Sequence, residues 1–268
     1  MFRQGYCLLA ARLSYGGKKS LANTKLRPTF YALPAGAWRD YVTLLHIPYT
    51  LWHLSYVVLG ASVAPSLHVD RLGGTLLAFF LAVGLAAHAL DELHGRPLRS
   101  RISGIWLAVI AALSLAGAIA IGALATVRIS LWALPFVLFG GFIVPAYNLE
   151  WFGGRLHSDI WFGLAWGAFP ALVGYWANAE SLQPQAFLVA AACLALSLGQ
   201  RALSKQARSL RRSAAMASGS IEFEDGHVEP ITITFLLAAP EKALRLTGLA
   251  VILLALGSLA ARLLASSL

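Results

Sequence analysis

Residues 72–101 read LGGTLLAFFLAVGLAAHALDELHGRPLRSR. Up to residue 87 this stretch contains no ionisable side chain, and after it ionisable side chains are crowded together. An apolar block of about 20 residues is long enough to cross a hydrocarbon core of about 30 Å as an α-helix. The stretch therefore predicts a membrane-spanning helix over residues 72–91, ending in a cluster of acidic, basic and histidine side chains.

Similar apolar blocks recur along the chain of 268 residues, which is 58% apolar and 12% charged, with a mean hydropathy of +0.69. Because a soluble domain carries roughly 25% charged residues, this composition excludes a water-soluble globule. We expect an all-α fold, a polytopic membrane helix bundle. About seven transmembrane helices are predicted, at residues 44–65, 72–91, 104–125, 130–149, 159–177, 185–203 and 244–265.

The predicted spans divide the chain into four parts. Residues 1–42 are expected to form a basic cytoplasmic tail, residues 43–205 the transmembrane core and residues 244–268 a C-terminal transmembrane helix. Residues 206–243 begin basic, become acidic and end in an apolar run of about ten residues, which is too short to span a bilayer. We expect this segment to be cytoplasmic or interfacial, with a short re-entrant piece.

The lysines and arginines are concentrated in the N-terminal segment and in alternate loops. Of the 21, all but Arg71, Arg128 and Arg262 lie in the N-terminal segment or in the second, fourth and sixth loops. The positive-inside rule therefore places the N-terminus and these loops in the cytoplasm. Orientation explains the formal charge of +9, so nucleic acid is not an expected partner. The two cysteines, Cys7 and Cys193, are too few and too far apart for a disulfide framework.

The densest group of ionisable residues ends the second span. On a continuous helix His88, Asp91 and Glu92 share one face, at i, i+3 and i+4. Such a face could hold a divalent cation, and the arginines that follow would supply donors for phosphate oxygens. This combination is typical of a diphosphate site, although acidic side chains that pair with arginines at a helix end would give the same pattern. The arginines are Arg96, Arg99 and Arg101.

Three further groups are candidates for the same site. Ionisable residues near membrane spans are costly to insert and are therefore functional candidates. The aromatic residues of the first span could line a cavity and stabilise a carbocation-like allylic group. The groups are His46, Tyr49, Trp52, His53 and Tyr56 in the first span; Tyr147, Glu150, His157 and Asp159 around the fourth loop; and Gln200, Arg201, Lys205 and Arg208 at the end of the sixth span.

The order of these features resembles the UbiA superfamily of intramembrane prenyltransferases. The resemblance covers roughly residues 40–205: a first helix ending near a Gly-Ala pair, a second ending in an acidic motif followed by RPLRSRIS at 96–103, and a fourth ending in Tyr147. It implies an all-helical fold, usually of nine spans, in which two Asp-rich cytoplasmic motifs hold Mg²⁺ and a prenyl diphosphate. The prenyl group then passes to an aromatic or other lipophilic acceptor.

The chain departs from the family pattern in three respects. Of the first motif, N-D-x-x-D-x-x-x-D, only Asp91 matches. Residues 198–208, where the second motif belongs, contain no carboxylate, and the last two family spans are missing.

The leading hypothesis is a diverged UbiA-like transferase that moves or cyclises a prenyl group. Asp91 and Glu92 would hold one Mg²⁺, helped by His88, while Arg96, Arg99, Arg101, Arg201, Lys205 and Arg208 would stabilise the departing diphosphate. Asp159 or Glu150 would act as general base. The allylic cation would lie near Tyr49, Trp52, His53, Tyr56 and Tyr147.

Two alternatives keep the fold and change the function. In one, His88, Asp91 and His94 bind Fe, Mn or Zn together with Glu92, His53 or His157, because imidazole and carboxylate ligands suit these metals. In the other, the chain is a non-catalytic protein on a decayed UbiA scaffold that binds a lipid or a partner subunit. A homo- or hetero-oligomer could replace the missing helices.

Overall fold

The computed structural model describes residues 26–265, and in this range the fold is all-α apart from one small hairpin. Seven helical segments there are long and apolar enough to cross a membrane. They confirm the predicted all-α membrane bundle and its seven spans. The segments are Ala37–Ser62, Val69–Gly95, Gly104–Arg128, Leu131–Asn148, Asp159–Ala179, Pro184–Arg212 and Ile233–Ala265.

Several of these segments are composed of shorter elements, including two π-helical stretches, η1 and η3, and a 3₁₀ turn, η2. In chain order the elements are α1 (Ala37–Leu44), α2 (Ile47–Ser62), α3 (Val69–Phe79), η1 (Phe80–Ala87), α4 (His88–Gly95), α5 (Gly104–Arg128), η2 (Leu131–Ala133), α6 (Leu134–Asn148), α7 (Asp159–Phe162), η3 (Gly163–Ala168), α8 (Phe169–Ala179), α9 (Pro184–Arg212), β1 (Ser220–Glu222), β2 (Val228–Pro230) and α10 (Ile233–Ala265).

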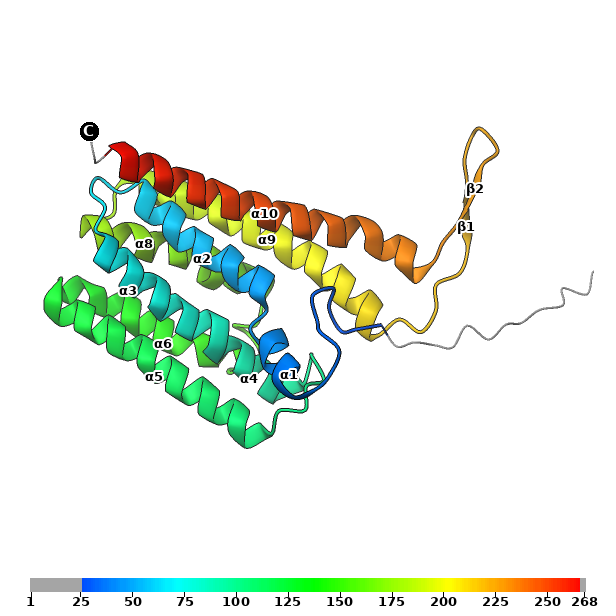
Figure 1. The fold of residues 1–268 in the computed structure, drawn as a ribbon, viewed down its shortest axis with the longest axis horizontal. Coiled ribbons are helices and arrows are strands. Elements are labelled where there is room, and N and C mark those ends of the chain that lie inside the picture. Colours follow the sequence, from blue (N-terminus) through cyan, green and yellow to red (C-terminus); the bar gives the residue numbers. More distant parts are fainter. Residues whose placement is uncertain (1–25, 266–268) are drawn as a thin grey trace, which may run out of the picture.

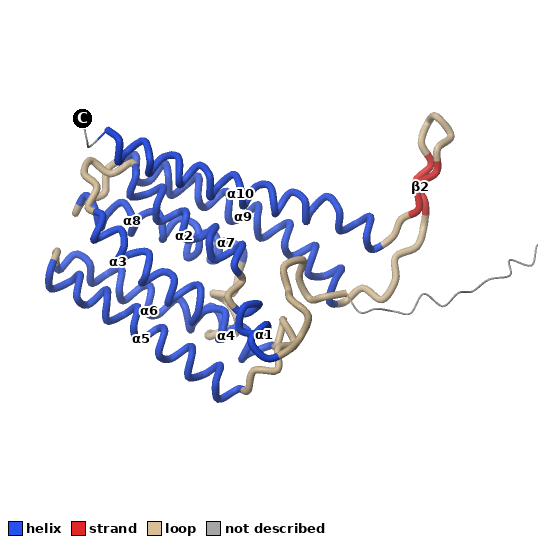
Figure 2. The backbone as a smooth tube through the Cα atoms, viewed as in Figure 1, coloured by secondary structure: helices blue, strands red, loops and turns tan. Residues whose placement is uncertain are grey.

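The long helices run side by side along the long axis of the molecule (Figure 1). α2 packs against α8 and α10, α9 packs against α10 and η3, and α5 packs against α6 and η1. The β1–β2 hairpin projects away from one end of the bundle, the end at which α1 and α4 also lie (Figure 2). We call this end the α4 end.

Glycine sets the closest approach between helices. A Cβ atom added to Gly60 of α2 would lie 2.0 Å from the carbonyl oxygen of Ala171 in α8. Likewise, a Cβ atom on Gly174 of α8 would lie 2.2 Å from the carbonyl oxygen of Val57. Small residues at such crossings allow backbones to meet, which is how membrane helices gain packing energy without a hydrophobic driving force.

The outer helices expose apolar side chains rather than polar ones. The apolar windows of α5 and α10 are each only 17% buried within the bundle. Large apolar side chains such as Leu113 and Val127 of α5 and Leu254 of α10 are exposed. A soluble protein rarely exposes so large a contiguous apolar surface, so these faces are suited to contact with lipid. The expected association with a lipid bilayer is therefore supported.

The segment between the last two spans differs from expectation. α9 continues to Arg212, and α10 starts at Ile233 as one helix of 33 residues, so no separate re-entrant piece forms. The start of α10 is held by Glu241, whose carboxylate pairs with the guanidinium of Arg211 on α9. Leu237 and Pro240 are buried beside this ion pair. The apolar run therefore opens the last helix.

The N-terminal region is also more ordered than a simple tail where it is described. Residues 1–25 of the predicted tail lie outside the described residues. From residue 26 onward the chain packs over the α4 end, with Thr29 and Ala32 buried. The buried Asp40 carboxylate of α1 accepts the backbone N–H of Gly36 at 3.0 Å and that of Arg101 at 2.8 Å. These bonds tie α1 to the loop that follows α4.

Candidate functional site

A cavity of about 270 Å³ lies at the α4 end, where α2, η1, α4, α6, η3 and α9 converge. We call it the arginine cavity, because Arg201, Arg208 and Arg212 of α9 line one side of it. The three follow one another at spacings of seven and four residues, which places them along one face of the helix. The structure thus brings a row of guanidinium groups to a cavity between membrane-spanning helices.

The three arginines differ in how they are held. Arg201 donates from Nε to Asp159 Oδ1 at 3.0 Å, and its side chain is only 14% exposed. Arg212 donates from Nε to the backbone carbonyl of Pro28 at 3.3 Å. The Arg208 guanidinium has no hydrogen-bond or ion-pair partner within residues 26–265. Its five N–H donors are therefore available to a ligand.

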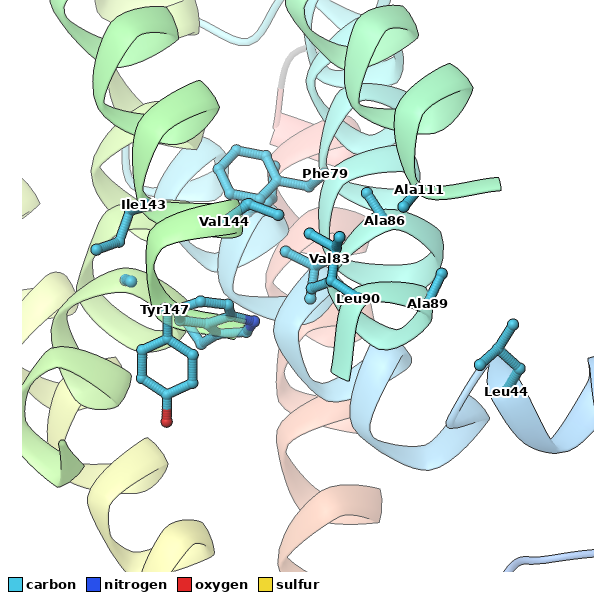
Figure 3. Packing of buried hydrophobic residues seen from close by; sticks show 14 of the residues in the cluster. Leu44, Phe79, Val83, Ala86, Ala89, Leu90, Ala111, Ile143, Val144 and Tyr147 are labelled. Atoms are coloured by element: carbon cyan, nitrogen blue, oxygen red, sulfur yellow. The ribbon is translucent and has the colours of Figure 1, made fainter. Parts of the chain in front are cut away.

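Two buried polar atoms in the cavity wall lack partners. Tyr147 is 4% exposed and Gln200 is 3% exposed. Neither the Tyr147 hydroxyl nor Gln200 Oε1 has a hydrogen-bond partner among the described residues. Figure 3 shows the Tyr147 hydroxyl directed away from the apolar cluster on which its ring packs. Because an unpaired buried polar group costs about 1–3 kcal/mol, these atoms are best explained as contacts for a bound ligand or water.

Backbone carbonyls fix the tautomers of three cavity histidines. The Nδ1 atoms of His53, His88 and His157 lie 2.8, 3.2 and 3.0 Å from the carbonyl oxygens of Trp166, Gly84 and Tyr147, respectively. A carbonyl oxygen can only accept, so each Nδ1 must carry the proton. The Nε2 atom of each neutral ring is consequently an acceptor, and that of His157 lies 3.4 Å from an Nη atom of Arg201.

A fourth histidine, His46, belongs to the candidate group of the first span and also lines the cavity. It precedes α2 with φ of 44°, in the left-handed region that non-glycine residues rarely adopt. Its ring stacks on that of His88 with 4.0 Å between the ring centroids. Such backbone strain is frequent at functional sites, and here it orients an imidazole into the cavity wall.

Of the two predicted acidic ligands, only Asp91 lines the cavity. Glu92 is fully buried, and its carboxylate accepts the backbone N–H of Leu98 and of Ser100, each at 2.8 Å. Of the three residues in the i, i+3, i+4 pattern, His88 and Asp91 therefore line the cavity. The Glu92 carboxylate instead binds backbone N–H groups of the loop that follows α4. No cluster of three or more His, Cys, Asp or Glu side chains placed to hold a metal occurs within residues 26–265.

The predicted arginines after α4 do not line the cavity. Arg96, itself in the left-handed region with φ of 49°, donates from Nη1 to the Ile102 carbonyl at 2.6 Å and so closes the loop. Arg99 reaches the carbonyl of Arg212 at 3.4 Å, and Arg101 is exposed. These three residues shape and surround the loop, whereas the cavity's cations come from α9.

The remaining predicted site residues divide between the cavity wall and its surroundings. Tyr49, His53 and Tyr147 line the cavity. Trp52 and Tyr56 belong to a neighbouring buried cluster, in which the Trp52 indole N–H donates to the Tyr56 hydroxyl at 2.5 Å. Outside the cavity lie Asp159, which pairs with Arg201; Lys205, whose side chain is 70% exposed; and Glu150, whose side chain is 48% exposed.

Sequence reasoning missed Tyr31, Trp166 and Arg212, all of which line the cavity. Tyr31 precedes the first span, and burial raises the pKa of its phenol, which therefore stays protonated and able to donate. Arg212 could have been found from the sequence, since it continues the row of Arg201 and Arg208 on one face of α9. Nothing in the local sequence marks the other two.

An apolar chamber adjoins the arginine cavity. It has a volume of about 110 Å³, and Trp166 lines both spaces. Phe79, Val83 and Val144 belong to the chamber wall, and Figure 3 shows them packed on the far side of Tyr147. The Trp166 ring lies 4.5 Å from that of Tyr147 and stacks on Phe162 at 5.9 Å, measured between centroids. A layer of aromatic rings thus lies between the polar arginine cavity and the apolar chamber.

Both π-helical stretches lie at this junction. η1 ends at Ala87, directly before His88, and η3 carries Trp166. A π-helical turn leaves backbone carbonyls displaced from their usual partners, and such turns are frequent at functional sites. Here the carbonyls of Gly84 and Trp166 are the ones that accept from His88 and His53.

No family model, curated protein or solved structure matches this chain. The structure supports a membrane-like bundle of seven helices, and the resemblance to the UbiA superfamily remains a prediction from the sequence pattern around Asp91–Ser103.

Proposed function

We propose that this chain is a membrane transferase that moves, or cyclises, a prenyl group from a prenyl diphosphate, with a lipophilic molecule as acceptor. One observation carries the proposal: a cavity with three arginines meets an apolar chamber at Trp166, inside a bundle of membrane-spanning helices. A molecule with an anionic head and an apolar tail matches both spaces at once. Its reactive carbon, between head and tail, would lie beside the aromatic layer.

The head would be bound mainly by guanidinium groups. Arg208 offers a full set of unpaired donors, and Arg201 and Arg212 supply further positive charge on the same helix face. Arginine forms strong, frequently bidentate hydrogen bonds with phosphate oxygens. The unpartnered Tyr147 hydroxyl would donate to the same head group.

In the proposed step the carbon–oxygen bond to the diphosphate breaks, and the diphosphate leaves with the electron pair. The arginine row stabilises the charge that develops on the leaving oxygen. The electron-rich faces of Tyr147, Phe162 and Trp166 stabilise the allylic cation that remains. A nucleophilic carbon or oxygen of the acceptor then bonds to this cation and loses a proton.

Mg²⁺ remains a predicted cofactor, and the donors present allow it a limited role. The ion is commonly held by one or two carboxylates together with substrate phosphates. Asp91 is the only carboxylate among the described residues that lines the cavity, and the Nε2 atom of His88 is a poor ligand for this ion. Asp91 would hold the ion, which would supply additional charge stabilisation for the departing diphosphate. We propose the α4 end as the cytoplasmic side.

The proposal is tested by matched variants on one helix. Arg208→Gln removes a cavity cation, and Lys205→Gln removes the same charge from the exposed side of α9. Both are expressed in a host membrane with the wild type, and extracted lipids are compared by mass. We expect a prenylated or cyclised product that falls at least tenfold in Arg208→Gln and Asp91→Asn and persists in Lys205→Gln.

Two other outcomes have definite meanings. If purified protein binds prenyl diphosphates through Arg208 but never yields a product, the chain is a binding protein on this scaffold. If the wild type neither binds nor converts these molecules, the proposed function is wrong.

A further inference from the structure

We infer that the apolar tail of the ligand runs from the aromatic layer at Trp166 through the bundle to the end opposite α4, in a path that accommodates a prenyl chain of about four isoprene units. The inference rests on the proposed function, because the arginine cavity must hold the diphosphate head. It adds the tail length of the substrate, which the sequence does not indicate.

The path begins with the apolar chamber and continues into a third cavity. This third space, the far groove, has a volume of about 350 Å³ and is lined by Gly74, Phe136 and Trp176 among others. Chamber and groove are contiguous because they share wall residues on four helices. The shared residues are Ala78, Phe79, Gly122, Phe136, Val137 and Val173.

Successive residues along the same helices line the arginine cavity, then the chamber and then the far groove. Along α7, η3 and α8, Phe162 lines the arginine cavity, Trp166 lines both cavity and chamber, and Trp176 lines the far groove. Along α6 the order is Tyr147, Val144 and then Phe136. Because the same helices line all three spaces in this order, the spaces follow one another along the bundle.

Aromatic rings follow this path over most of its length. Phe169 lies 5.7 Å from Phe79 and 6.3 Å from Phe136, and Phe136 lies 5.2 Å from Trp176, measured between ring centroids. Unsaturated chains pack well on such surfaces, since ring faces and edges offer large apolar areas at low conformational cost.

Helix geometry gives the length of the path. Tyr147, in the aromatic layer, and Ala133, which lines the far groove directly before α6, are fourteen residues apart, which corresponds to about 21 Å at 1.5 Å per residue. An extended chain advances about 1.2 Å per bond, so an isoprene unit with four chain bonds covers about 5 Å. The path from the aromatic layer to this end of the groove therefore holds about four units.

Charged side chains end the apolar path. Arg71 donates from Nη1 to Glu180 Oε1 at 2.7 Å and to the Ala177 carbonyl at 3.3 Å. Asp70, Arg71 and Arg128 all line the margin of the far groove. Placing an apolar terminus among these groups would desolvate them without providing a partner, so tails longer than the path gain little from further insertion.

Two adjacent glycines on α3 provide the test. Gly74 lines the far groove and Gly73 does not, and a Cβ atom added to either meets nothing within 4 Å. Gly74→Phe, and the smaller Gly74→Leu, would fill the groove, whereas Gly73→Phe adds the same ring on an exposed face. Purified variants are titrated with geranyl, farnesyl and geranylgeranyl diphosphate, which have two, three and four isoprene units.

In the wild type and Gly73→Phe we expect affinity to rise at least tenfold from two units to four, because each buried methylene adds favourable transfer energy. Gly74→Phe should keep the geranyl affinity and lose most of this rise, with Gly74→Leu intermediate. Retained binding of geranyl diphosphate shows that the variants are folded. Partitioning of the tails into detergent affects the Gly73→Phe and Gly74→Phe measurements equally, so it does not contribute to the difference between them.

A tail-length dependence that survives Gly74→Phe overturns the inference and leaves the proposed function intact. If the wild type binds none of the three diphosphates and Arg208→Gln changes nothing, the proposed function fails, and the tail path fails with it.

Discussion

The Nδ1–H of His53 donates to the backbone carbonyl of Trp166 at 2.8 Å, and this bond joins α2 to η3 where the arginine cavity meets the apolar chamber. His53 is 3% exposed, so neither partner can exchange the bond for one to water. The bond therefore fixes the imidazole and the π-helical turn of η3 together. Both ends of the binding site depend on that turn, because Trp166 belongs to both walls.

Removing this donor should destabilise the bundle. His53→Leu leaves the Trp166 carbonyl buried and unpaired, which costs about 1–3 kcal/mol and should lower the apparent Tm by several degrees. Thermal unfolding in detergent measures the change. His68→Leu is the matched control, because His68 is exposed and its side chain makes no hydrogen bond within residues 26–265. Equal melting temperatures for the two variants would contradict this prediction.

Substitutions of the neighbouring residues Glu92 and Asp91 should have different effects: loss of Glu92 should lower stability, and loss of Asp91 should weaken Mg²⁺-dependent diphosphate binding. Glu92→Ala removes an acceptor for two backbone N–H groups and should cost about 2–4 kcal/mol of stability. Glu92→Gln keeps one acceptor and should cost less. Mg²⁺-dependent diphosphate binding, measured with and without EDTA, should weaken in Asp91→Asn and keep its metal dependence in Glu92→Gln. The reverse result would restore Glu92 as a ligand.

The ion pair between Arg211 and Glu241 should contribute to stability without contributing to ligand binding. Both side chains are largely buried, and neither lines the arginine cavity. Arg211→Gln leaves the buried Glu241 carboxylate with only the more distant Arg245, at 4.0 Å, as an ion-pair partner, so the loss should approach the roughly 3–5 kcal/mol of a broken buried pair. The double variant Arg211→Gln, Glu241→Gln should recover much of this loss, and a double-mutant cycle of apparent unfolding free energies measures the coupling. Diphosphate affinity should stay within twofold in folded variants, and a larger loss would show that Arg211 reaches the ligand.

The crossing of α2 and α8 should tolerate no side chain at its glycines. Gly60→Ala and Gly174→Ala place a methyl group against a backbone carbonyl and should each cost about 1–3 kcal/mol or more. Gly199→Ala of α9 meets nothing within 4 Å and should be neutral or stabilising, since alanine favours helix by about 1 kcal/mol. Detergent unfolding of the three variants gives the comparison. A neutral Gly174→Ala would mean that the helices are not in backbone contact.

How far the sequence predicts the structure depends on the range of the interactions involved. The seven spans follow from local composition, because about 20 apolar residues must form a helix to satisfy their backbone groups in lipid. The basic α4 end, the row of Arg201 and Arg208 and the presence of Asp91 in the site could be predicted for the same reason, since helical spacing places them. The helix ends were less accurate: α10 begins at Ile233, eleven residues before the predicted start of the last span, and Glu241 in this added part pairs with Arg211 on another helix.

Only the tertiary structure decided which charged residues face the cavity. Glu92 and Asp91 are adjacent in sequence, yet one satisfies a loop and the other lines the site, because the backbone of residues 98 and 100 folds back onto Glu92. Trp166 and Tyr31 joined the site through packing between distant helices, which no local pattern records. The sequence by itself determined that this chain is a membrane bundle with a basic end. Packing between helices determined that this end contains an arginine cavity, which shares Trp166 as a wall residue with an apolar chamber.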